Sequence, residues 1–344
     1  MPTTLPLDVC IRQQPYPPGL DRLRAMKNVR VTCVDVGPDE ECPWHLPSDI
    51  EQSVQVILSC YLPANFKSAK NLRLIQIPSA GYSQLGGHNL PAHNVRACNA
   101  AGVFDPPIAE WNISMMINLA RDIRGMIRNQ ESGIWDRPAK FQREIAGSVV
   151  GFWGYGGLAR ETTRLCKSMG MTVHVLARSG VKSREATYVV PGRGDPEGKL
   201  PDKVFSPAEK DAFLNSLDFL VIAMPLTGQT QGLIGEAELR ALPRHAFLLN
   251  PARGPIVQEQ ALLRALREGW IAGAALDTHY YYPMPADHPL WRFPNVIMTP
   301  HISGSTATQT YDQRVWDIFL INMQRFADGE PLLNELTAKQ LNEA

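Results

Sequence analysis

The residues whose types and spacing most clearly favour a chemical task lie in Gly154–Ala159, GYGGLA, which fits the pattern G-x-G-x-x-G/A. The apolar run Val149–Trp153 precedes this turn as a predicted strand, Thr162–Met169 follows in a predicted helix, and Met171–Leu176 is a second apolar strand. In such a unit the first glycine makes the tight turn, and the second lets backbone N–H groups approach a pyrophosphate at the helix N-terminus. The segment therefore predicts a dinucleotide site, with a phosphate-free turn as the alternative.

The end of the second predicted strand indicates which dinucleotide would bind. An NAD-binding protein usually carries Asp or Glu there, about 20 residues after the glycine turn, to hold the ribose 2′-hydroxyl. This chain has Ala177, Arg178 and Ser179 at that place. A carboxylate would repel a 2′-phosphate, whereas Arg and Ser offer it a cation and a hydroxyl. We therefore predict a preference for NADPH over NADH, and the alternative is that Arg178 is an ordinary solvated charge.

Further polar residues follow apolar runs that are typical of buried parallel strands. Arg253, Asp277 and His301 each come shortly after one of these runs. Because ligands bind at the carboxyl edge of a doubly wound parallel sheet, we expect these three side chains to meet at one cleft. Taken singly, Arg253 could be a structural charge and His301 a buried, hydrogen-bonded histidine. The runs are Leu217–Ile222, Ala246–Leu249, Ile271–Leu276 and Val296–Met298.

The chain before the glycine turn predicts a separate α/β domain with its own sheet. In it, the N–H groups of Ser79–Gly81 could face a ligand carboxylate, or the segment could be a plain turn. A helix at Ile108–Met126 is expected to cross into the second domain, and one at Thr306–Phe326 to return to the first. The polar stretch Gly133–Arg143 predicts a loop, and Val189–Asp202 a surface insertion. The earlier elements expected are strands at Leu7–Ile11, Val29–Val36, Val54–Leu58 and Leu72–Ile77, and a helix near Gly19–Met26.

Composition limits the classes of function. The 344 residues suffice for two domains, and 34 basic against 34 acidic residues give a formal net charge of zero. No charge excess therefore favours nucleic acid or an anionic membrane, and no apolar run approaches the roughly 20 residues of a membrane-spanning helix. The N-terminal residues lack the basic and apolar regions of a secretory signal. Six cysteines without metal-ligand spacing (10, 33, 42, 60, 98 and 166) predict free thiols, no metal site and a cytoplasmic protein.

Several motifs in order resemble the D-isomer-specific 2-hydroxyacid dehydrogenase family. They are PSAGY at 78–82, AE at 109–110, GFWGYGGLAR at 151–160, PLTGQTQGLIG at 225–235, NPARGPIV at 250–257, GAALD at 273–277 and DHPLWRFPNVIMTPHISG at 287–304. The resemblance implies an oxidoreductase that interconverts 2-oxo acids and D-2-hydroxy acids with NAD or NADP. It also implies a Rossmann-type doubly wound parallel sheet inserted in a smaller flavodoxin-like α/β domain, and a homodimer formed mainly through the nucleotide domains. We expect a substrate domain at residues 1–110 and 306–344 and a dinucleotide-binding domain at 111–305.

The resemblance also assigns catalytic roles. The family's arginine matches Arg253, whose charged, bidentate guanidinium suits a substrate carboxylate and carbonyl, and its histidine matches His301, a general acid. The family's glutamate beside that histidine is replaced by Tyr282, which supplies no negative charge to keep the imidazole protonated. Either the Tyr282 hydroxyl holds the imidazole in one tautomer, or the loop is displaced and the residue only packs. The family includes formate dehydrogenases, whose formate-specific asparagine matches Phe104 in this chain. A formate enzyme is therefore not expected.

Two functions remain open. The first is an NADPH-dependent 2-oxo-acid reductase that binds a small-molecule substrate. The second is a non-catalytic, dinucleotide-sensing protein that binds partners, similar to the C-terminal-binding-protein corepressors. The predicted catalytic residues are Arg253, His301 and Tyr282, and the predicted substrate-binding residues are Ser79, Ala80, Gly81 and Phe104. The predicted cofactor-binding residues are Gly154, Tyr155, Gly156, Gly157, Leu158, Arg178, Ser179, Pro225, Thr230, Pro251, Ala252 and Asp277.

Overall fold

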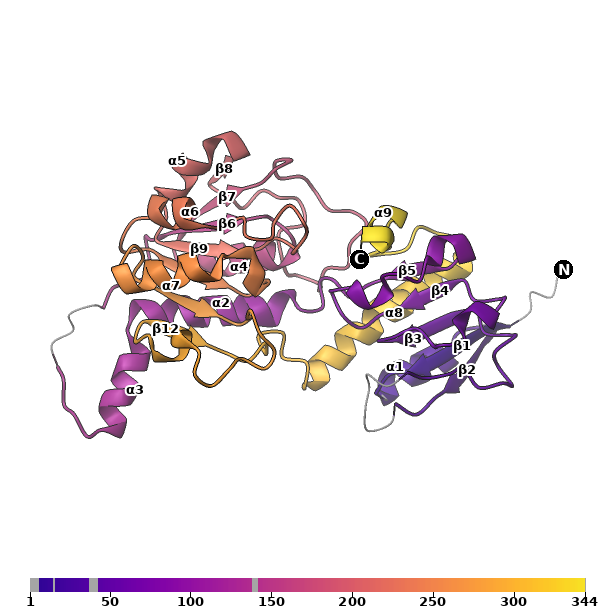
Figure 1. Cartoon of the computed structure of the whole chain (residues 1–344). Coiled ribbons are helices and arrows are strands. Elements are labelled where there is room, and N and C mark those ends of the chain that lie inside the picture. The colour runs from indigo at the N-terminus through magenta and orange to yellow at the C-terminus, as the bar shows by residue number, and fades with distance from the viewer. Residues whose placement is uncertain (1–5, 15, 37–42, 138–141, 344) are drawn as a thin grey trace. The chain divides into compact units, whose positions relative to one another are not determined.

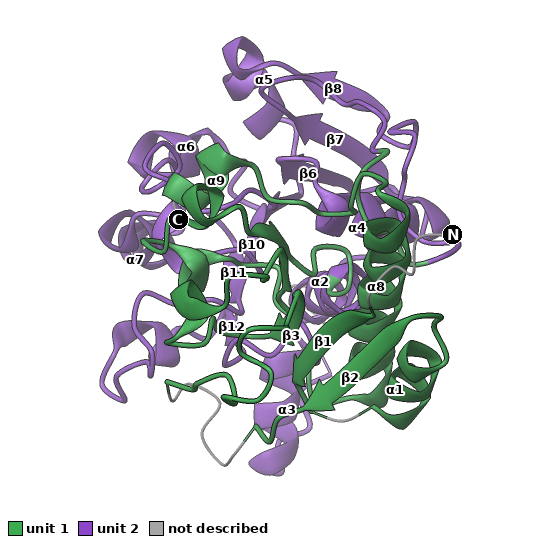
Figure 2. Ribbon diagram, turned by 90° about the vertical axis from the view of Figure 1, so that its right-hand side faces the viewer, with its two compact units in different colours: residues 1–104, 185–190, 306–344 green, residues 105–184, 191–305 purple. Residues whose placement is uncertain are grey.

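A computed structural model describes residues 6–14, 16–36, 43–137 and 142–343 (Figure 1). Cys42 and part of the predicted loop at 133–143 lie outside the described residues. The chain divides into two compact units, shown in different colours in Figure 2. Unit 1 comprises residues 1–104, 185–190 and 306–344, and unit 2 comprises residues 105–184 and 191–305. None of the described helices is both long and apolar enough to cross a membrane.

Unit 1 is built on a parallel sheet with the strand order β2-β1-β3-β4-β5, which is the flavodoxin-like order. The side chains of alternate residues of β1 point to opposite faces of this sheet. Val9 and Ile11 pack in one apolar cluster with helices α1 and α8, whereas Cys10 belongs to a second cluster. Figure 1 shows α8 lying along this sheet. The elements are β1 Leu7–Arg12, α1 Pro17–Arg24, β2 Val29–Cys33, β3 Val56–Ser59, β4 Leu74–Gln76, β5 Arg96–Cys98, α8 Gln309–Asp328 and α9 Ala338–Glu343.

Unit 2 has a parallel sheet with the order β12-β11-β10-β9-β6-β7-β8, in which the direction of winding reverses between β6 and β9. Phe219 and Val221 of β9 pack in a cluster with α2 and α4, while Leu220 and Ile222 pack in a cluster with α5, α6 and α7. Both faces are therefore covered, and the predicted Rossmann-type fold class is confirmed. The elements are α2 Asp105–Ala120, α3 Ile123–Glu131, β6 Val149–Trp153, α4 Gly157–Ser168, β7 Thr172–Leu176, β8 Lys203–Phe205, α5 Lys210–Leu214, β9 Phe219–Ile222, α6 Glu236–Ala241, β10 Phe247–Asn250, α7 Glu259–Glu268, β11 Gly273–Leu276 and β12 Val296–Met298.

The single helix predicted at Ile108–Met126 is wrong, because the chain forms two helices there, α2 and α3. Asp122 lies between them with a φ of +48°, a left-handed conformation that ends a helix. Its side chain then accepts a hydrogen bond from the N–H of Gly125 at 3.2 Å. An apolar spacing that continues across the break cannot reveal it, whereas an Asp cap beginning a second helix accounts for it.

The segment predicted as a surface insertion, Val189–Asp202, is in part buried. Residues 185–190 belong to unit 1, where Tyr188 is only 4% exposed and packs in the cluster of α1 and α8. Asn334 fixes them there, since its side chain accepts from the N–H of Tyr188 and its N–H donates to the carbonyl of Ala186, both at 3.0 Å. The rest of the insertion returns to unit 2, where Asp195 is buried.

Candidate active site

The glycine turn after β6 has the geometry that a pyrophosphate needs. Gly154 has a φ of +96°, and a side chain there would meet the carbonyl oxygen of Ala223 at 2.5 Å, so only glycine fits. Gly156 caps α4, and a Cβ at this position would meet nothing within 4 Å. That open space lies at a helix N-terminus, whose first N–H groups have no intrahelical partner. These residues therefore fit a dinucleotide phosphate.

Residues of the segment 191–202 stabilise the glycine turn through side-chain contacts. The Tyr155 hydroxyl donates to the carboxylate of Asp195 at 2.7 Å, and the Arg160 guanidinium lies 4.9 Å from the centre of the Tyr155 ring. Asp195 also accepts from the N–H groups of Lys199 and Leu200 at 2.9 and 3.1 Å. The side chain of Tyr155 is thus committed to protein contacts, and only its backbone can face a phosphate. The sequence pattern carried no signal for the Asp195 contact.

The residues that follow β7 form a tight turn. The N–H of Gly180, which has a φ of +67°, donates to the carbonyl of Ala177 at 3.3 Å. Arg178 and Ser179 stand exposed in the middle of this turn. In the described part of the chain, Arg178 forms no ion pair, and its hydrogen bond is to the neutral side chain of Gln229 at 3.0 Å. This arrangement fits an anion such as a 2′-phosphate.

The loop after β9 holds two of the predicted cofactor residues. The Thr230 hydroxyl donates to the carbonyl of Pro225 and accepts from the N–H of Thr227, each at 2.7 Å. The N–H of Gly232 donates to the carbonyl of Pro255 at 2.8 Å. Thr230 therefore shapes the loop from inside, and it sets the position of the exposed tip around Gln229.

Arg253 is presented by a loop that buried residues fix. The Asn250 amide, 1% exposed, donates to the carbonyl of Arg253 at 2.9 Å and accepts from the N–H of Ala252 at 3.1 Å. Gly254 packs so closely against the backbone of His279 that a Cβ would overlap its carbonyl. Pro251 is buried, whereas Arg253 is exposed. Its guanidinium is bonded to the carbonyl of Ala252 at 2.7 Å, which leaves further N–H groups for a carboxylate.

His301 is held in an unusual backbone conformation. Its φ is +57°, a conformation that costs a residue with a Cβ about 1–3 kcal/mol and that persists only where the surroundings hold it. The fully buried carboxylate of Asp277 accepts from the N–H groups of Ile302 and Ser303, at 3.0 and 3.1 Å, and from the Thr299 hydroxyl at 2.6 Å. Thr299 in turn accepts from the indole N–H of Trp111 at 3.1 Å. Asp277 was predicted as a cofactor residue, but its carboxylate forms hydrogen bonds that position the His301 loop.

The electrostatic surroundings of His301 favour its neutral form. Partial burial lowers the pKa of His301 below its ordinary value, and the positive charge of Arg253 lowers that pKa as well. The Asp277 carboxylate opposes these effects, and His279 adds to them. The groups that depress the pKa prevail, so His301 gives up its proton readily.

Tyr282 lies beside His301, with the two ring centres 5.6 Å apart. Its hydroxyl accepts from the backbone N–H of His279 at 3.2 Å, so the contact with the imidazole is made by the ring. The buried His279 was missed by sequence reasoning. Its Nε2 donates to the carbonyl of Thr299 at 2.8 Å, and its Nδ1 is without a partner among the described residues.

In unit 1, the turn after β4 is preorganised. The Ser79 hydroxyl donates to the carbonyl of Gly81 and accepts from the side chain of Gln84, both at 2.8 Å. The N–H groups of Ala80 and Gly81 form no hydrogen bond with any other described residue. Phe104 packs against Tyr311, with ring centres 5.6 Å apart. Gln84 and Tyr311 were not singled out from the sequence, because neither lies in a recognisable motif.

Comparison with known proteins shows which family this chain resembles. The family model described as "D-isomer specific 2-hydroxyacid dehydrogenase, NAD binding domain" matches residues 113–303. A glyoxylate reductase from Thermofilum pendens is 29% identical over 91% of this chain and 89% of its own length. A D-3-phosphoglycerate dehydrogenase from Archaeoglobus fulgidus is 32% identical over 78% of this chain and 48% of its own length.

Solved structures extend the comparison to the whole fold. A D-isomer specific 2-hydroxyacid dehydrogenase family protein from Aeromonas salmonicida has a TM-score of 0.75 at 25% identity, covering 96% of this chain and 99% of its own. An NADPH-dependent glyoxylate/hydroxypyruvate reductase from Sinorhizobium meliloti, in complex with NADP and sulfate, has a TM-score of 0.73 at 22% identity, covering 97% and 99%. The second likeness shows the fold alone. Together with the family match, these findings show that the chain belongs to the D-isomer specific 2-hydroxyacid dehydrogenase family of NAD(P)-dependent oxidoreductases.

Proposed function

We propose that this protein is an NADPH-dependent reductase that converts 2-oxo acids to D-2-hydroxy acids. The observation that carries the proposal is the pair of prepared loops at the carboxyl edge of the unit 2 sheet, one after β10 and one after β12, with β11 between these strands. One loop, fixed by Asn250, presents the exposed guanidinium of Arg253, and the other, fixed by Asp277, presents His301. A cation and a proton donor held in this way are the two groups that reduction of a 2-oxo acid requires of the protein.

In the proposed reaction, Arg253 forms paired hydrogen bonds to the substrate carboxylate and polarises the neighbouring carbonyl. When bound, the nicotinamide cofactor supplies the hydride. His301 donates its proton to the oxygen that was the carbonyl oxygen, and so prevents an alkoxide from accumulating. Within unit 1, the N–H groups of Ala80 and Gly81 are proposed to be available to a carboxylate, and Phe104 is proposed to be a substrate-binding residue.

Tyr282 is proposed to act through packing. Its ring limits the movement of the His301 imidazole, but it brings no negative charge to stabilise the protonated form. The acid therefore works at the depressed pKa described above. Reduction needs protonated His301, so the rate should fall as pH rises through a pKa below the ordinary value.

The preference for NADPH is proposed from the turn after β7. Arg178 and Ser179 are exposed, and Arg178 meets a neutral partner, so their donors are available to a 2′-phosphate. The pyrophosphate would lie at Gly154–Leu158, against the N-terminus of α4. The remaining predicted cofactor residues, Pro225, Thr230, Pro251 and Ala252, belong to loops that follow β9 and β10.

The test is NADPH oxidation with a panel of 2-oxo acids, namely glyoxylate, 2-oxo-4-methylpentanoate and phenylpyruvate. We expect turnover of at least one of them, a product of D configuration, and a lower Kd for NADPH than for NADH. Replacing Arg253 with Lys keeps the charge but loses the bidentate geometry, and it should raise KM and lower kcat. Binding of the dinucleotide without turnover of any 2-oxo acid would favour the non-catalytic alternative.

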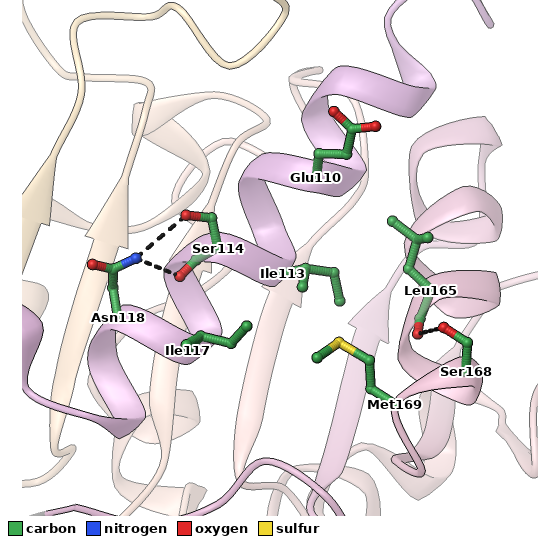
Figure 3. A pocket seen from close by; sticks show the side chains of 8 residues that line it. All are labelled: Glu110, Ile113, Ser114, Ile117, Asn118, Leu165, Ser168 and Met169. Atoms are coloured by element: carbon green, nitrogen blue, oxygen red, sulfur yellow. Dashed lines mark hydrogen bonds between the residues drawn. The ribbon is translucent and has the colours of Figure 1, made fainter.

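We also propose that the protein is a homodimer formed through unit 2. Helix α3 has no buried residue, and it projects away from the sheet of its unit (Figure 1). Trp135, just beyond it, is 92% exposed, which is costly for so large an apolar side chain in a monomer. A groove between α2 and α4 adds further apolar surface, including Ile113, Leu165 and Met169 (Figure 3). Two copies could cover both surfaces reciprocally.

The oligomeric state can be measured by sedimentation equilibrium. The wild-type chain should sediment as a dimer, and Trp135→Glu should weaken association because it places a charge in the proposed interface. The control is Val204→Glu, which alters an exposed apolar residue of unit 2 on β8, at the opposite edge of the sheet from β12. A monomeric wild type, or equal effects of the two substitutions, would contradict the proposal.

A further inference from the structure

A side-chain contact bridges the carboxyl edge of the unit 2 sheet. Arg178 comes two residues after the end of β7, and Gln229 lies in the loop after β9. Strand β6 lies between these strands, and its last residue, Trp153, pairs with the last residue of each neighbour. The hydrogen bond from the Arg178 Nη1 to the Gln229 Oε1, 3.0 Å long, therefore crosses the edge where the chain enters the glycine turn.

The backbone that carries Gln229 is fixed before any ligand arrives. The Thr230 hydroxyl closes the loop through Pro225 and Thr227, and Gly232 ties it to the segment after β10. On the other side, the turn closed by Ala177 and Gly180 holds Arg178. Two prepared loops thus present a guanidinium and a carboxamide to each other.

The chemistry of the pair determines its orientation. A guanidinium only donates hydrogen bonds, so the Gln229 carboxamide must turn its oxygen toward Arg178 and its nitrogen away. That nitrogen makes no hydrogen bond with any other described residue. Because the carboxamide is neutral, the contact orients the guanidinium without offsetting its charge. Arg164 differs, since it is paired with the carboxylate of Glu161 at 2.7 Å.

We propose that Gln229 is a specificity-determining residue for the 2′-phosphate of the dinucleotide. Its oxygen holds Arg178 in place, and its two N–H groups donate to the same phosphate, to which Arg178 and Ser179 also donate. The proposal rests on the NADPH preference proposed above and names a third member of that phosphate site. A carboxylate at position 229 would remove these donors, pair with Arg178 and repel the phosphate.

The decisive variant is Gln229→Glu, which keeps the shape of the side chain and changes its charge. Its Kd for NADPH should rise about tenfold or more, while its Kd for NADH changes less than about threefold. The same substitution at the nearby exposed residue, Gln231→Glu, adds equal charge to the loop and serves as the matched control. Gln229→Ala should give an intermediate loss, because it removes donors without adding charge.

A double substitution tests whether Gln229 acts together with Arg178. In an Arg178→Ala background the penalty of Gln229→Glu on NADPH binding should shrink, because no guanidinium remains to be neutralised. Competition by adenosine 2′-phosphate against adenosine 5′-phosphate should show the same pattern, which places the effect at the 2′ position.

The outcomes separate the two proposals. Equal affinities of the wild type for NADPH and NADH would overturn the cofactor preference, and the role of Gln229 with it. A clear wild-type preference that Gln229→Glu lowers no more than Gln231→Glu would overturn only the role of Gln229. An equal loss of NADH and NADPH binding in Gln229→Glu would also overturn it, because the effect would then be unrelated to the 2′-phosphate.

Discussion

Two regions of unit 2 prepare a ligand site in different ways. The phosphate edge, residues 154–159 and 177–180, works mainly through its backbone, because a Cβ at Gly154 would meet the Ala223 carbonyl and the space beside Gly156 is open. The catalytic edge, residues 250–254, 277–282 and 299–303, works through two exposed side chains. There the buried Asn250 and Asp277 hold the backbone, so that Arg253 and His301 stand free.

The difference shows where substitutions should act. At Gly154 of the phosphate edge, the backbone conformation itself requires glycine, so a change there should alter stability and binding together. At the catalytic edge the reacting side chain and the residues that fix it are separate. A change in the reacting group should therefore lower the rate while leaving the fold intact.

The largest effect is expected for His301→Ala, which removes the acid from the catalytic edge. Turnover should fall by a factor on the order of 10²–10⁴, because proton donation by a positioned side chain contributes about that much. The measurement is kcat with saturating NADPH, together with the thermal unfolding midpoint, which should hardly change. His245→Ala, at an exposed histidine, is the control. A His301→Ala enzyme with full turnover would show that another group supplies the proton.

The second prediction concerns charge at the phosphate edge. Ala177→Asp should weaken NADPH binding about ten- to hundredfold, because the new carboxylate repels the 2′-phosphate and competes for Arg178. Binding of NADH should be kept or improved, since Asp can hold a 2′-hydroxyl. Dissociation constants of both cofactors would be measured by titration, with the uncharged Ala177→Asn as the control. An equal loss of NADPH affinity in both variants would mean that the size of the side chain at position 177, and not its charge, weakens binding.

The third prediction separates the two glycines of the turn. Gly154→Ala should lower the free energy of unfolding by about 1–3 kcal/mol, because its φ of +96° is strained for alanine. Gly156→Ala should leave the stability of the free protein nearly unchanged, because its Cβ meets nothing within 4 Å, yet it should weaken dinucleotide binding. Urea unfolding and cofactor titration of both variants provide the measurement. Equal stability of the two variants would contradict the distinction.

The smallest expected effect is a shift in a pH profile. Tyr282→Glu places a negative charge beside His301 and should raise the pKa of the imidazole. Since reduction needs the protonated form, the alkaline fall in kcat should move to higher pH. Tyr282→Phe should leave that limb in place, because the Tyr282 hydroxyl bonds to the His279 backbone. A deuterium isotope effect must first show that hydride transfer limits kcat. An unmoved limb in an active Tyr282→Glu enzyme would show that the carboxylate does not reach His301.

Local features of the fold were predictable from the sequence. The strands at Val149–Trp153 and Val296–Met298 have the predicted bounds. Apolar periodicity and glycine spacing are properties of contiguous residues, so they can be recognised directly in the sequence. The break before α3 was missed because an Asp in a left-handed conformation has no distinctive pattern.

The supporting contacts of the candidate site could not be predicted. Gln229 meets Arg178 across 51 positions of sequence, and Trp111 meets Thr299 across 188. Such pairs depend on strand order and loop shape, which a single sequence does not specify. For the same reason the match of Tyr282 to the family's glutamate indicated a position near His301, but not that its hydroxyl would turn toward the His279 backbone.

The assignment of residues 185–190 to unit 1 has a consequence for the order of folding. During synthesis, residues 105–184 and 191–305, which make up unit 2, are complete before helix α8 exists, so the sheet of unit 2 can form first. Unit 1 begins earlier in the chain, but its core must wait for Tyr188 and then for Asn334, which lies 146 residues further on. Such long-range closure is slow. Strands β1–β5 are therefore synthesised before unit 2, but they reach their native packing after it.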